Sequence, residues 1–294
     1  MNNQRFNIRI IAWALIALYT FLLPDAILIY RKIVDLFGQA TAGKVPLMAA
    51  LLLGGLFALI VFRQKKDWRN LLYLVPCGLI ALAIFTLEPN PNKHIHIPEY
   101  VLMAWLLYWV LSKDIRGGQI LILVFLYASL LGVTDELQQG VHPGRFYGAS
   151  DMLVNASSAL IGVFTILGLT RHEKSDWGWL KELKRIKGLN WLAGIGLILV
   201  FLMCFHLFRV QADDEFWGIF PTWLWVGNVM FLLLTFIRLI RYYTNLHQGE
   251  KRKAAKQAAA NAAEARLWVV PLLVIISYMQ VLVVYVSAFG VEFK

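Results

Sequence analysis

Apolar runs long enough to cross a membrane alternate with short polar segments along the whole chain. A helix needs about 20 apolar residues to cross the hydrocarbon core of a bilayer. About nine runs reach or approach that length, at residues 10–29, 45–62, 71–87, 97–111, 120–133, 152–169, 189–208, 222–239 and 267–289. The pattern predicts an all-α, polytopic integral membrane protein with about nine transmembrane helices. The runs at 97–111 and 120–133 are short, so we expect them to span only where protein or a wet cavity covers their polar ends.

The basic residues predict the orientation of these helices, because cytoplasmic loops of membrane proteins carry an excess of Lys and Arg. With the N-terminus in the cytoplasm, the nine runs place all but seven of the 28 Lys and Arg residues on the cytoplasmic side; the seven are Arg31, Lys32, Lys44, Lys93, Arg145, Arg209 and Lys294. We therefore expect an N-in, C-out protein. The segment 242–266 is rich in Ala and Lys and lacks proline, so it is predicted to form a basic, helical cytoplasmic loop.

The composition favours a membrane protein over a soluble one. Hydrophobic residues make up 59% of the 294 residues and charged residues only 16%, whereas soluble domains carry about a quarter charged residues. The net charge of +10 would suggest nucleic acid in a soluble protein, but here membrane orientation explains it, and we expect no nucleic-acid partner. Cys77 and Cys204 lie inside apolar runs and are predicted to be small core residues. The first run lacks a small-residue cleavage site and is predicted to be a retained helix.

Two predicted extracytoplasmic loops, at residues 88–100 and 134–151, are unusually polar. In the first loop, Pro98 suits the first turn of a helix. That start would place His96, Glu99 and Tyr100 on one helix face, because they are three and four residues apart. The histidines His94 and His142 are expected to be exposed loop residues.

The second polar loop joins two predicted helices. Asp135 and Glu136 directly follow an apolar run, where ionisable groups are costly and need partners. Arg145 is the expected partner, because its planar guanidinium binds a carboxylate through two hydrogen bonds. Ser150 is predicted to be the N-cap of the next helix, with Asp151 in its first turn, where the helix dipole favours a negative charge.

A stripe of small and polar residues continues along that next helix. Asp151 and Asn155 are four residues apart and share a face, and Ser158 and Gly162 extend it. Small side chains let a second helix approach closely. The run 120–133, joined by the same loop, is the expected neighbour.

The two loops together carry more acid than base. With neutral histidines their formal charge is −3, from the five acids Glu88, Glu99, Asp135, Glu136 and Asp151 and the two bases Lys93 and Arg145. Such a site is expected to hold a cation, to raise the pKa of one or more carboxylates, or both.

The combined spacing resembles that of a known family. The segments Lys93-x-x-His96-x-x-Glu99-Tyr100, Asp135-Glu136-x-x-Gln139, Pro143-Gly144-Arg145 and Asp151-x-x-x-Asn155 are similar to the VanZ-like family, named for a teicoplanin-resistance protein. The resemblance covers about residues 71–169. It implies a four-helix membrane domain at 71–170, between two N-terminal transmembrane helices at 1–70 and three further helices at 171–294.

The resemblance and the polar loops predict a location and a function together. They imply a multi-pass protein of the bacterial plasma membrane that binds or modifies a lipid-linked or cell-wall substrate at the extracytoplasmic face, with a link to glycopeptide resistance. The candidate catalytic residues are Glu136, Asp135 and Asp151. The candidate substrate-binding residues are Lys93, His96, Glu99, Tyr100, Gln139, Arg145 and Asn155.

Other readings of the same residues stay open at this stage. The polar cluster could be a structural knot of ion pairs. No spacing matches a metal signature such as HExxH, so we expect no cofactor and no resident metal, although His94, His96, Asp135, Glu136 and Asp151 keep a divalent cation as an alternative. A transporter or scramblase, or a non-catalytic scaffold, are the alternative functions. Lone polar residues on apolar helices are expected to form interhelical hydrogen bonds; they are Asp25, His206, Asn228 and Gln280.

Overall fold

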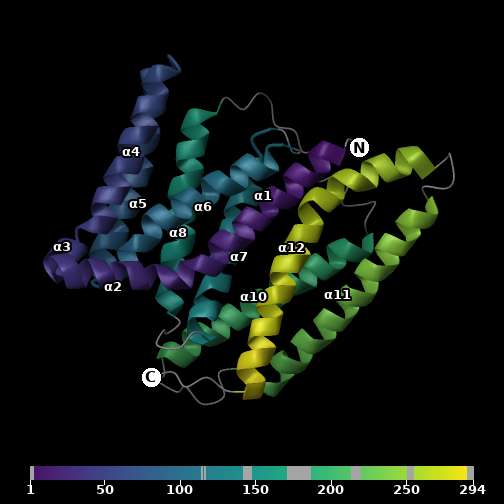
Figure 1. Ribbon diagram of the computed structural model, residues 1–294. Coiled ribbons are helices and arrows are strands. Elements are labelled where there is room, and N and C mark those ends of the chain that lie inside the picture. The colour runs from purple at the N-terminus through teal and green to yellow at the C-terminus, as the bar shows by residue number, and fades with distance from the viewer. Residues whose placement is uncertain are drawn as a thin grey trace. The chain divides into compact units, whose positions relative to one another are not determined.

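The computed structural model describes residues 3–113, 115, 117–141, 148–170, 187–212, 220–249 and 255–289, and the regular elements in these ranges are all helical (Figure 1). The chain forms two compact units. Unit 1 comprises Met1–Asp135 and Ser150–Ser175, and unit 2 comprises Glu136–Ala149 and Asp176–Lys294. The all-α prediction is confirmed.

Unit 1 contains the helices from the N-terminus to residue 169, apart from the last turns of α7. Its α-helices and 3-10 helices are α1 (Asn3–Leu22), η1 (Leu23–Asp25), α2 (Ala26–Phe37), α3 (Gln39–Ala42), α4 (Val45–Arg63), η2 (Trp68–Tyr73), α5 (Leu74–Leu87), η3 (Pro91–Ile95), α6 (His96–Leu111), α7 (Ile120–Val141) and α8 (Ala149–Leu169). Apolar side chains from α5, α6 and α8 form a buried cluster within it; the cluster comprises Cys77, Ile84, Ile97, Val101, Val154 and Ile161.

Local sequence explains the breaks between the first helices of unit 1. Pro24 lies in η1, where α1 gives way to a short 3-10 turn before α2, because proline removes a helical hydrogen bond and clashes with the preceding turn. Gly38 ends α2 with φ of 79°, a left-handed conformation that glycine adopts at little cost. The single predicted helix at 10–29 is therefore two helices with a bend between them.

Unit 2 contains three long helices, α10 (Lys187–Ala212), α11 (Thr222–Gly249) and α12 (Ala255–Phe289), and these helices pack against one another. Gly196 of α10 lies at a close contact with the two other helices. A Cβ atom there would lie 2.7 Å from a side-chain atom of Ile276 and 2.9 Å from the ring of Phe231. The segment 242–266 was predicted to be a helical loop. Its first part, up to residue 249, is the end of α11, and its last part, from residue 255, is the start of α12.

Eight helices in the described ranges are long and apolar enough to cross a membrane. They indicate a multi-pass membrane protein. The predicted ninth span at 97–111 differs from the others, because α6 has only 16 residues. At 1.5 Å per residue it extends about 24 Å, less than the roughly 30 Å of a hydrocarbon core. The run at 120–133 is longer than predicted, because α7 continues to Val141 and keeps the polar residues Thr134 to Gln139 helical.

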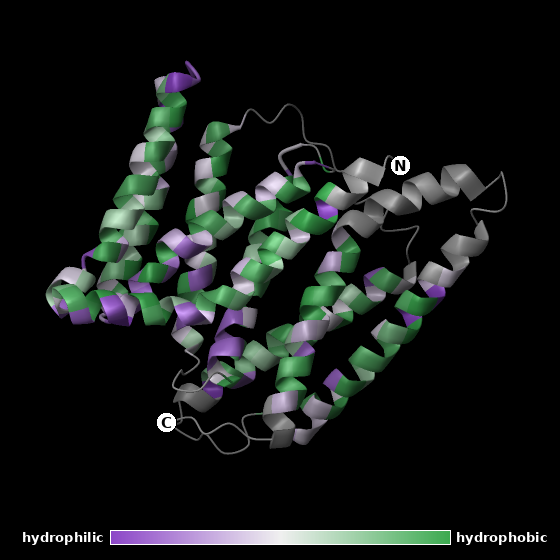
Figure 2. Ribbon diagram, viewed as in Figure 1, coloured by the Kyte–Doolittle hydropathy of each residue, from purple (hydrophilic) through white to green (hydrophobic). Residues whose placement is uncertain are grey.

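The helices of unit 1 differ in how much apolar surface they leave exposed. α7 is mostly buried, whereas α4 and α5 expose most of their apolar length. Figure 2 shows hydrophobic residues over most of the length of α4. Exposed leucines on these two helices include Leu51, Leu52, Leu79 and Leu82. Such a surface suits lipid as the solvent.

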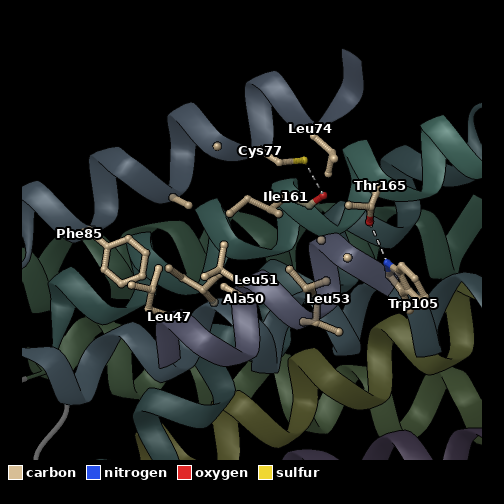
Figure 3. A pocket seen from close by; sticks show the side chains of 16 residues that line it. Leu47, Ala50, Leu51, Leu53, Leu74, Cys77, Phe85, Trp105, Ile161 and Thr165 are labelled. Atoms are coloured by element: carbon tan, nitrogen blue, oxygen red, sulfur yellow. Dashed lines mark hydrogen bonds between the residues drawn. The ribbon is translucent and has the colours of Figure 1, made fainter. Parts of the chain in front are cut away.

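Unit 1 also contains a partly open cavity of about 470 Å³, with walls from α4, α5, α6 and α8 (Figure 3). Cys77 lines it and is buried, as predicted for a core residue, whereas Cys204 in unit 2 is only partly buried. The cavity lies within one unit and is therefore a feature of a single packed body.

Candidate functional site

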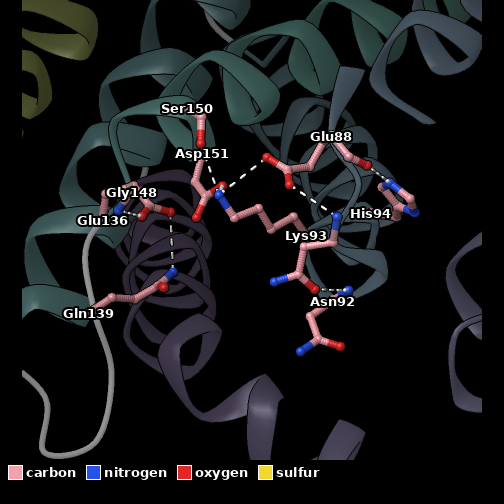
Figure 4. A network of polar contacts seen from close by, with 10 residues as sticks. Glu88, Asn92, Lys93, His94, Glu136, Gln139, Gly148, Ser150 and Asp151 are labelled. Atoms are coloured by element: carbon pink, nitrogen blue, oxygen red, sulfur yellow. Dashed lines mark hydrogen bonds and ion pairs between the residues drawn. The ribbon is translucent and has the colours of Figure 1, made fainter. Parts of the chain in front are cut away.

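Lys93 is the centre of a polar network in unit 1 (Figure 4). It lies in η3, which Pro91 opens after the end of α5. Its Nζ is 2.8 Å from Oδ1 of Asp151 and 3.2 Å from Oε2 of Glu88. It also donates a hydrogen bond of 2.9 Å to Oγ of Ser150. One ammonium group therefore connects the end of α5, η3 and the first turn of α8.

The surroundings of Lys93 favour its charged form. Burial lowers the pKa of this ammonium, but the hydrogen bonds and negative charges of Asp151 and Glu88 outweigh burial, so the pKa of Lys93 is raised above 10.5. We expected Lys93 to hold an anionic head group. The structure instead shows its ammonium group paired with two carboxylates, which leaves little positive charge for an anion.

His96, Glu99 and Tyr100 share one face of α6, as predicted. Nδ1 of His96 lies 3.0 Å from Oε2 of Glu99, and the rings of His96 and Tyr100 have centroids 6.2 Å apart. The backbone carbonyl of Glu99 accepts a hydrogen bond of 3.0 Å from the hydroxyl of Tyr19 in α1. This hydrogen bond attaches the first turn of α6 to α1 and fixes the backbone that carries these side chains.

Asp135 meets this helix from α7. The hydroxyl of Tyr100 donates a hydrogen bond of 3.2 Å to Oδ2 of Asp135, and both residues are fully buried. A buried carboxylate needs such a donor, because desolvation penalises its charge. We expected Arg145 to be the partner of Asp135 or Glu136. Arg145 lies outside the described residues, as does His142, and the partner found within them is Tyr100.

Asn155 connects α8 to α7. Its Nδ2 donates a hydrogen bond of 3.3 Å to the carbonyl of Gly132. A Cβ at Gly132 would lie only 2.8 Å from Cβ of Asn155, so glycine is what allows the two backbones to approach this closely. The prediction that the helix at 120–133 packs against the Asp151–Asn155 face is confirmed at this position.

The stripe of small and polar residues on α8 has a different neighbour at Gly162, about two helical turns after Asn155. A Cβ at Gly162 would lie 2.6 Å from Cβ of Ala104 and 3.2 Å from backbone atoms of Val101, both in α6. The expectation that α7 packs along the whole stripe is therefore wrong at Gly162. The face of α8 that carries the stripe twists past α7 and meets α6, because a straight helix drifts relative to a fixed four-residue repeat.

Glu136 and Gln139 belong to unit 2 and are joined to each other by a hydrogen bond. The backbone N–H of Gly148 donates a hydrogen bond of 3.0 Å to Oε2 of Glu136, and Nε2 of Gln139 donates one of 3.3 Å to its Oε1. Gly148 directly precedes α8, so the carboxylate of Glu136 satisfies one of the free amides at the start of that helix. Beside them, Nε2 of Gln138 donates to the hydroxyl of Tyr278 in α12 at 3.0 Å.

Two predictions about single residues are wrong. His94 is buried rather than exposed, and its Nε2 lies 2.8 Å from the carbonyl oxygen of Glu88. His94 lies in η3, the 3-10 helix that begins at Pro91, and its ring packs against Phe85. A prediction of an irregular, exposed loop does not anticipate this contact. Ser150 is not the N-cap of α8, because that helix already begins at Ala149. Asp151 does lie in its first turn, as predicted.

The predicted interhelical hydrogen bonds of two lone polar residues are missing. Asn228 and Gln280 are fully buried in unit 2, and their side-chain amides have no hydrogen-bond partner within the part of the chain that the structure describes.

The candidate site residues predicted from the sequence did not include three groups that the structure brings to the site. Glu88 pairs with Lys93, and its place between an apolar run and a lysine five residues later was a usable signal. Ser150 contributes its hydroxyl to Lys93 rather than to its own helix. Tyr19 comes from a helix far away in sequence, and no local pattern pointed to it.

The described part of unit 1 can accept hydrogen bonds better than it can bind anions. Four carboxylates, those of Glu88, Glu99, Asp135 and Asp151, share the region with the single ammonium of Lys93. Carboxylates act as hydrogen-bond acceptors and as acids or bases. The arrangement therefore suits a ligand that donates hydrogen bonds through hydroxyl or amino groups.

No protein family, curated protein or solved structure matches this chain. The resemblance to the VanZ-like family consequently stays a prediction from the spacing of residues between 93 and 155.

Proposed function

We propose that this chain is a multi-pass protein of the bacterial plasma membrane that binds, and in an enzymatic version modifies, a lipid-linked or cell-wall substrate at the extracytoplasmic face. The polar network around Lys93 is the observation that supports this proposal. It joins Glu88 at the end of α5 to Ser150 and Asp151 in the first turn of α8, at distances of 2.8 to 3.2 Å. A membrane protein that gathers charged groups in one place usually does so for function.

The chemistry of the network narrows the part of the substrate that it contacts. Sugar hydroxyls and amino groups donate hydrogen bonds to carboxylates. Both occur in cell-wall precursors. Glu99, oriented through its neighbours His96 and Tyr19, would be one acceptor, and Asp151 another.

In the enzymatic version, buried carboxylates transfer protons. Asp135 accepts a hydrogen bond from Tyr100 and Glu136 accepts one from Gly148, so each is held in a fixed orientation, as an acid or base requires. Asp151 would be the third candidate. The link to glycopeptide resistance suggested by the VanZ-like spacing belongs to this proposal.

The function test compares variants in a host that depends on the chain for glycopeptide resistance. We expect Asp151→Asn and Glu99→Gln to lower resistance and to change the content of surface precursors. Asp67→Asn is the matched control, because Asp67 only caps η2 at an exposed position. Equal amounts of each variant in the membrane must be shown. Wild-type resistance in both site variants at equal amounts would contradict the proposal.

The proposed nine-span, N-in/C-out arrangement depends on α6, the predicted span that is not among the eight apolar helices of membrane-spanning length in the described ranges. Single cysteines at Asn92 and Lys113, in a background with Cys77→Ala and Cys204→Ala, flank this helix. If α6 spans, an impermeant maleimide applied to intact spheroplasts labels position 92 and leaves position 113 unlabelled. Labelling of both positions, or of neither, would show that α6 does not cross and that the predicted sidedness of the later loops is inverted.

A further inference from the structure

The cavity of unit 1 has the size of a ligand site. Its volume of about 470 Å³ falls within the roughly 300–1,000 Å³ of small-molecule pockets. Phe85 and Trp105 lie near opposite ends of the lining in Figure 3. A cavity of this volume is too small for a helix of a partner protein, whose diameter with side chains is about 10 Å or more.

The polar side chains that line this cavity already donate their hydrogen bonds within the protein. Of the side chains that line it, only those of Cys77, Trp105 and Thr165 carry polar atoms. Nε1 of Trp105 donates to Oγ1 of Thr165 at 2.8 Å, and that hydroxyl donates to the carbonyl of Gly162 at 2.6 Å. The thiol of Cys77 donates to the carbonyl of Ile161 at 3.6 Å. Each donor is already used, so the wall presents hydrocarbon.

Three glycines keep part of the cavity open. Gly54 and Gly55 of α4 and Gly78 of α5 line it, and a Cβ at any of them would meet no atom within 4 Å. Glycine costs about 1 kcal/mol relative to alanine inside a helix. At these positions no close helix contact explains that cost, in contrast to Gly132 and Gly162, where a Cβ would collide with a neighbouring helix.

One end of the cavity adjoins the polar network. The ring of Phe85, which lines the cavity, packs edge-on against the ring of His94 with centroids 4.5 Å apart. His94 in turn contacts the backbone of Glu88, the partner of Lys93. Ile97, another lining residue, directly follows His96. This end of the cavity therefore lies beside the charged groups of the polar network.

We propose that a single hydrocarbon chain of a membrane lipid occupies this cavity, with hydroxyl or amino groups of that lipid's polar part donating hydrogen bonds to the carboxylates of the Lys93 network. An apolar cavity of this kind excludes water and accepts apolar ligands, and the surrounding bilayer supplies hydrocarbon chains. The inference rests on the proposed function and deepens it, because it selects a lipid-borne substrate over a water-soluble wall fragment.

Photocrosslinking tests the occupant directly. The full chain is reconstituted in nanodiscs that contain either a phosphatidylethanolamine with a diazirine in the middle of one acyl chain or an isoprenyl alcohol with a diazirine in its chain. Crosslinked residues are mapped by mass spectrometry. We expect crosslinks at residues that face the cavity, such as Leu53, Ala81 and Trp105. The probe that reacts there identifies the source of the chain as acyl or isoprenoid.

Matched glycine variants separate the cavity from the outer lipid surface. Gly78→Phe and Gly54→Phe place a ring in the cavity and should reduce crosslinking at its lining about tenfold, which corresponds to about 1.4 kcal/mol of binding. Gly194→Phe is the control, because a Cβ at Gly194 also meets no atom within 4 Å but this residue does not line the cavity. Unchanged unfolding temperatures in detergent show that the variants fold, and two filling positions allow for the loss of one.

The outcomes distinguish this inference from the proposed function. Absence of cavity crosslinks with both probes, or crosslinks that survive both filling variants, would overturn the lipid-chain inference. The resistance phenotypes of Asp151→Asn and Glu99→Gln do not depend on that result. Conversely, cavity crosslinks together with wild-type resistance in those variants would retain the bound chain and remove the function proposed for the polar network.

Discussion

The polar network of unit 1 and the interior of the three-helix bundle in unit 2 treat buried polar groups in opposite ways. Lys93 has three polar partners within 3.2 Å, supplied by the end of α5 and the first turn of α8. Asn228 and Gln280 are more deeply buried, yet no hydrogen bond to their amides is found within the described residues. Polar character alone therefore does not mark a site in this protein.

The difference lies in where the polar residues stand on their helices. Those of unit 1 gather at helix ends, next to turns whose backbone and side chains supply partners. Asn228 and Gln280 each lie within a long, mostly apolar helix, and their amide atoms have no hydrogen-bond partner among the described residues. A functional site needs several groups with complementary charge, and of these two regions only the network in unit 1 brings such groups together.

The largest effect is expected from removing the acid that Lys93 contacts most closely. Asp151→Ala leaves the half-buried ammonium with Glu88 as its one carboxylate partner and with the hydroxyl of Ser150, and breaking a buried pair by removing one partner is costly. Because Lys93 is partly exposed, we expect a loss of about 2–3 kcal/mol in the free energy of unfolding. Denaturant unfolding in detergent measures it. A loss below that of the exposed control Asp67→Ala would mean that the network contributes no stability.

A smaller effect is expected from the hydrogen bond between Tyr100 and Asp135. Tyr100→Phe removes the donor and leaves the carboxylate buried, which should cost about 1–2 kcal/mol. The same unfolding experiment tests it, with Tyr285→Phe as the control at an exposed tyrosine. Equal stability of wild type and Tyr100→Phe would show that Asp135 is satisfied by another group.

Replacing the buried amide of unit 2 should act in the opposite direction. Asn228→Leu removes polar atoms without a hydrogen bond and should raise the unfolding free energy by up to about 1 kcal/mol. The thermal midpoint in detergent reports the change. Destabilisation by the same substitution would show that Asn228 has a polar partner, and the contrast between the two regions would then disappear.

The smallest effect is a dependence of stability on alkaline pH. The pKa of Lys93 is raised in the folded protein, so folding stabilises the protonated form. That contribution is fully present below the ordinary value of 10.5 and is lost as the pH rises through the folded-state pKa. The stability difference between wild type and Lys93→Met should therefore stay constant up to pH 10.5 and shrink above it. A difference that already declines as the pH is raised from neutral toward 10.5 would contradict the raised pKa.

Periodicity in the sequence predicted the helices and some of the site. The shared face of His96, Glu99 and Tyr100 and the approach of Asn155 to α7 follow from helical spacing, because residues three and four apart lie on one side. The same rule cannot say which helix lies opposite. The Gly162 position therefore meets α6 rather than α7, a fact that depends on packing across many turns.

Features produced by tertiary structure escaped the sequence analysis. Burial of His94 depends on a 3-10 turn and on Phe85, and the hydrogen bond from Tyr19 to Glu99 joins residues 80 positions apart. The cavity is a property of the space between four helices, and no residue pattern states its volume. The glycine pair Gly54 and Gly55 was the one feature of the sequence that pointed to the cavity, since two glycines in an apolar helix destabilise it and need a structural reason.

The bend at Pro24 has a consequence for how the protein responds to its bilayer. The apolar stretch Ile8–Phe37 has 30 residues and would extend about 45 Å as one helix, well beyond a hydrocarbon core of about 30 Å. α1, with 20 residues, matches that core by itself, and the amphipathic α2 can then lie along the headgroup boundary. A bent segment of this kind can accommodate hydrophobic mismatch by changing how much of α2 enters the membrane. We therefore expect thicker and thinner bilayers to shift the boundary between the membrane-embedded and interfacial parts of this stretch.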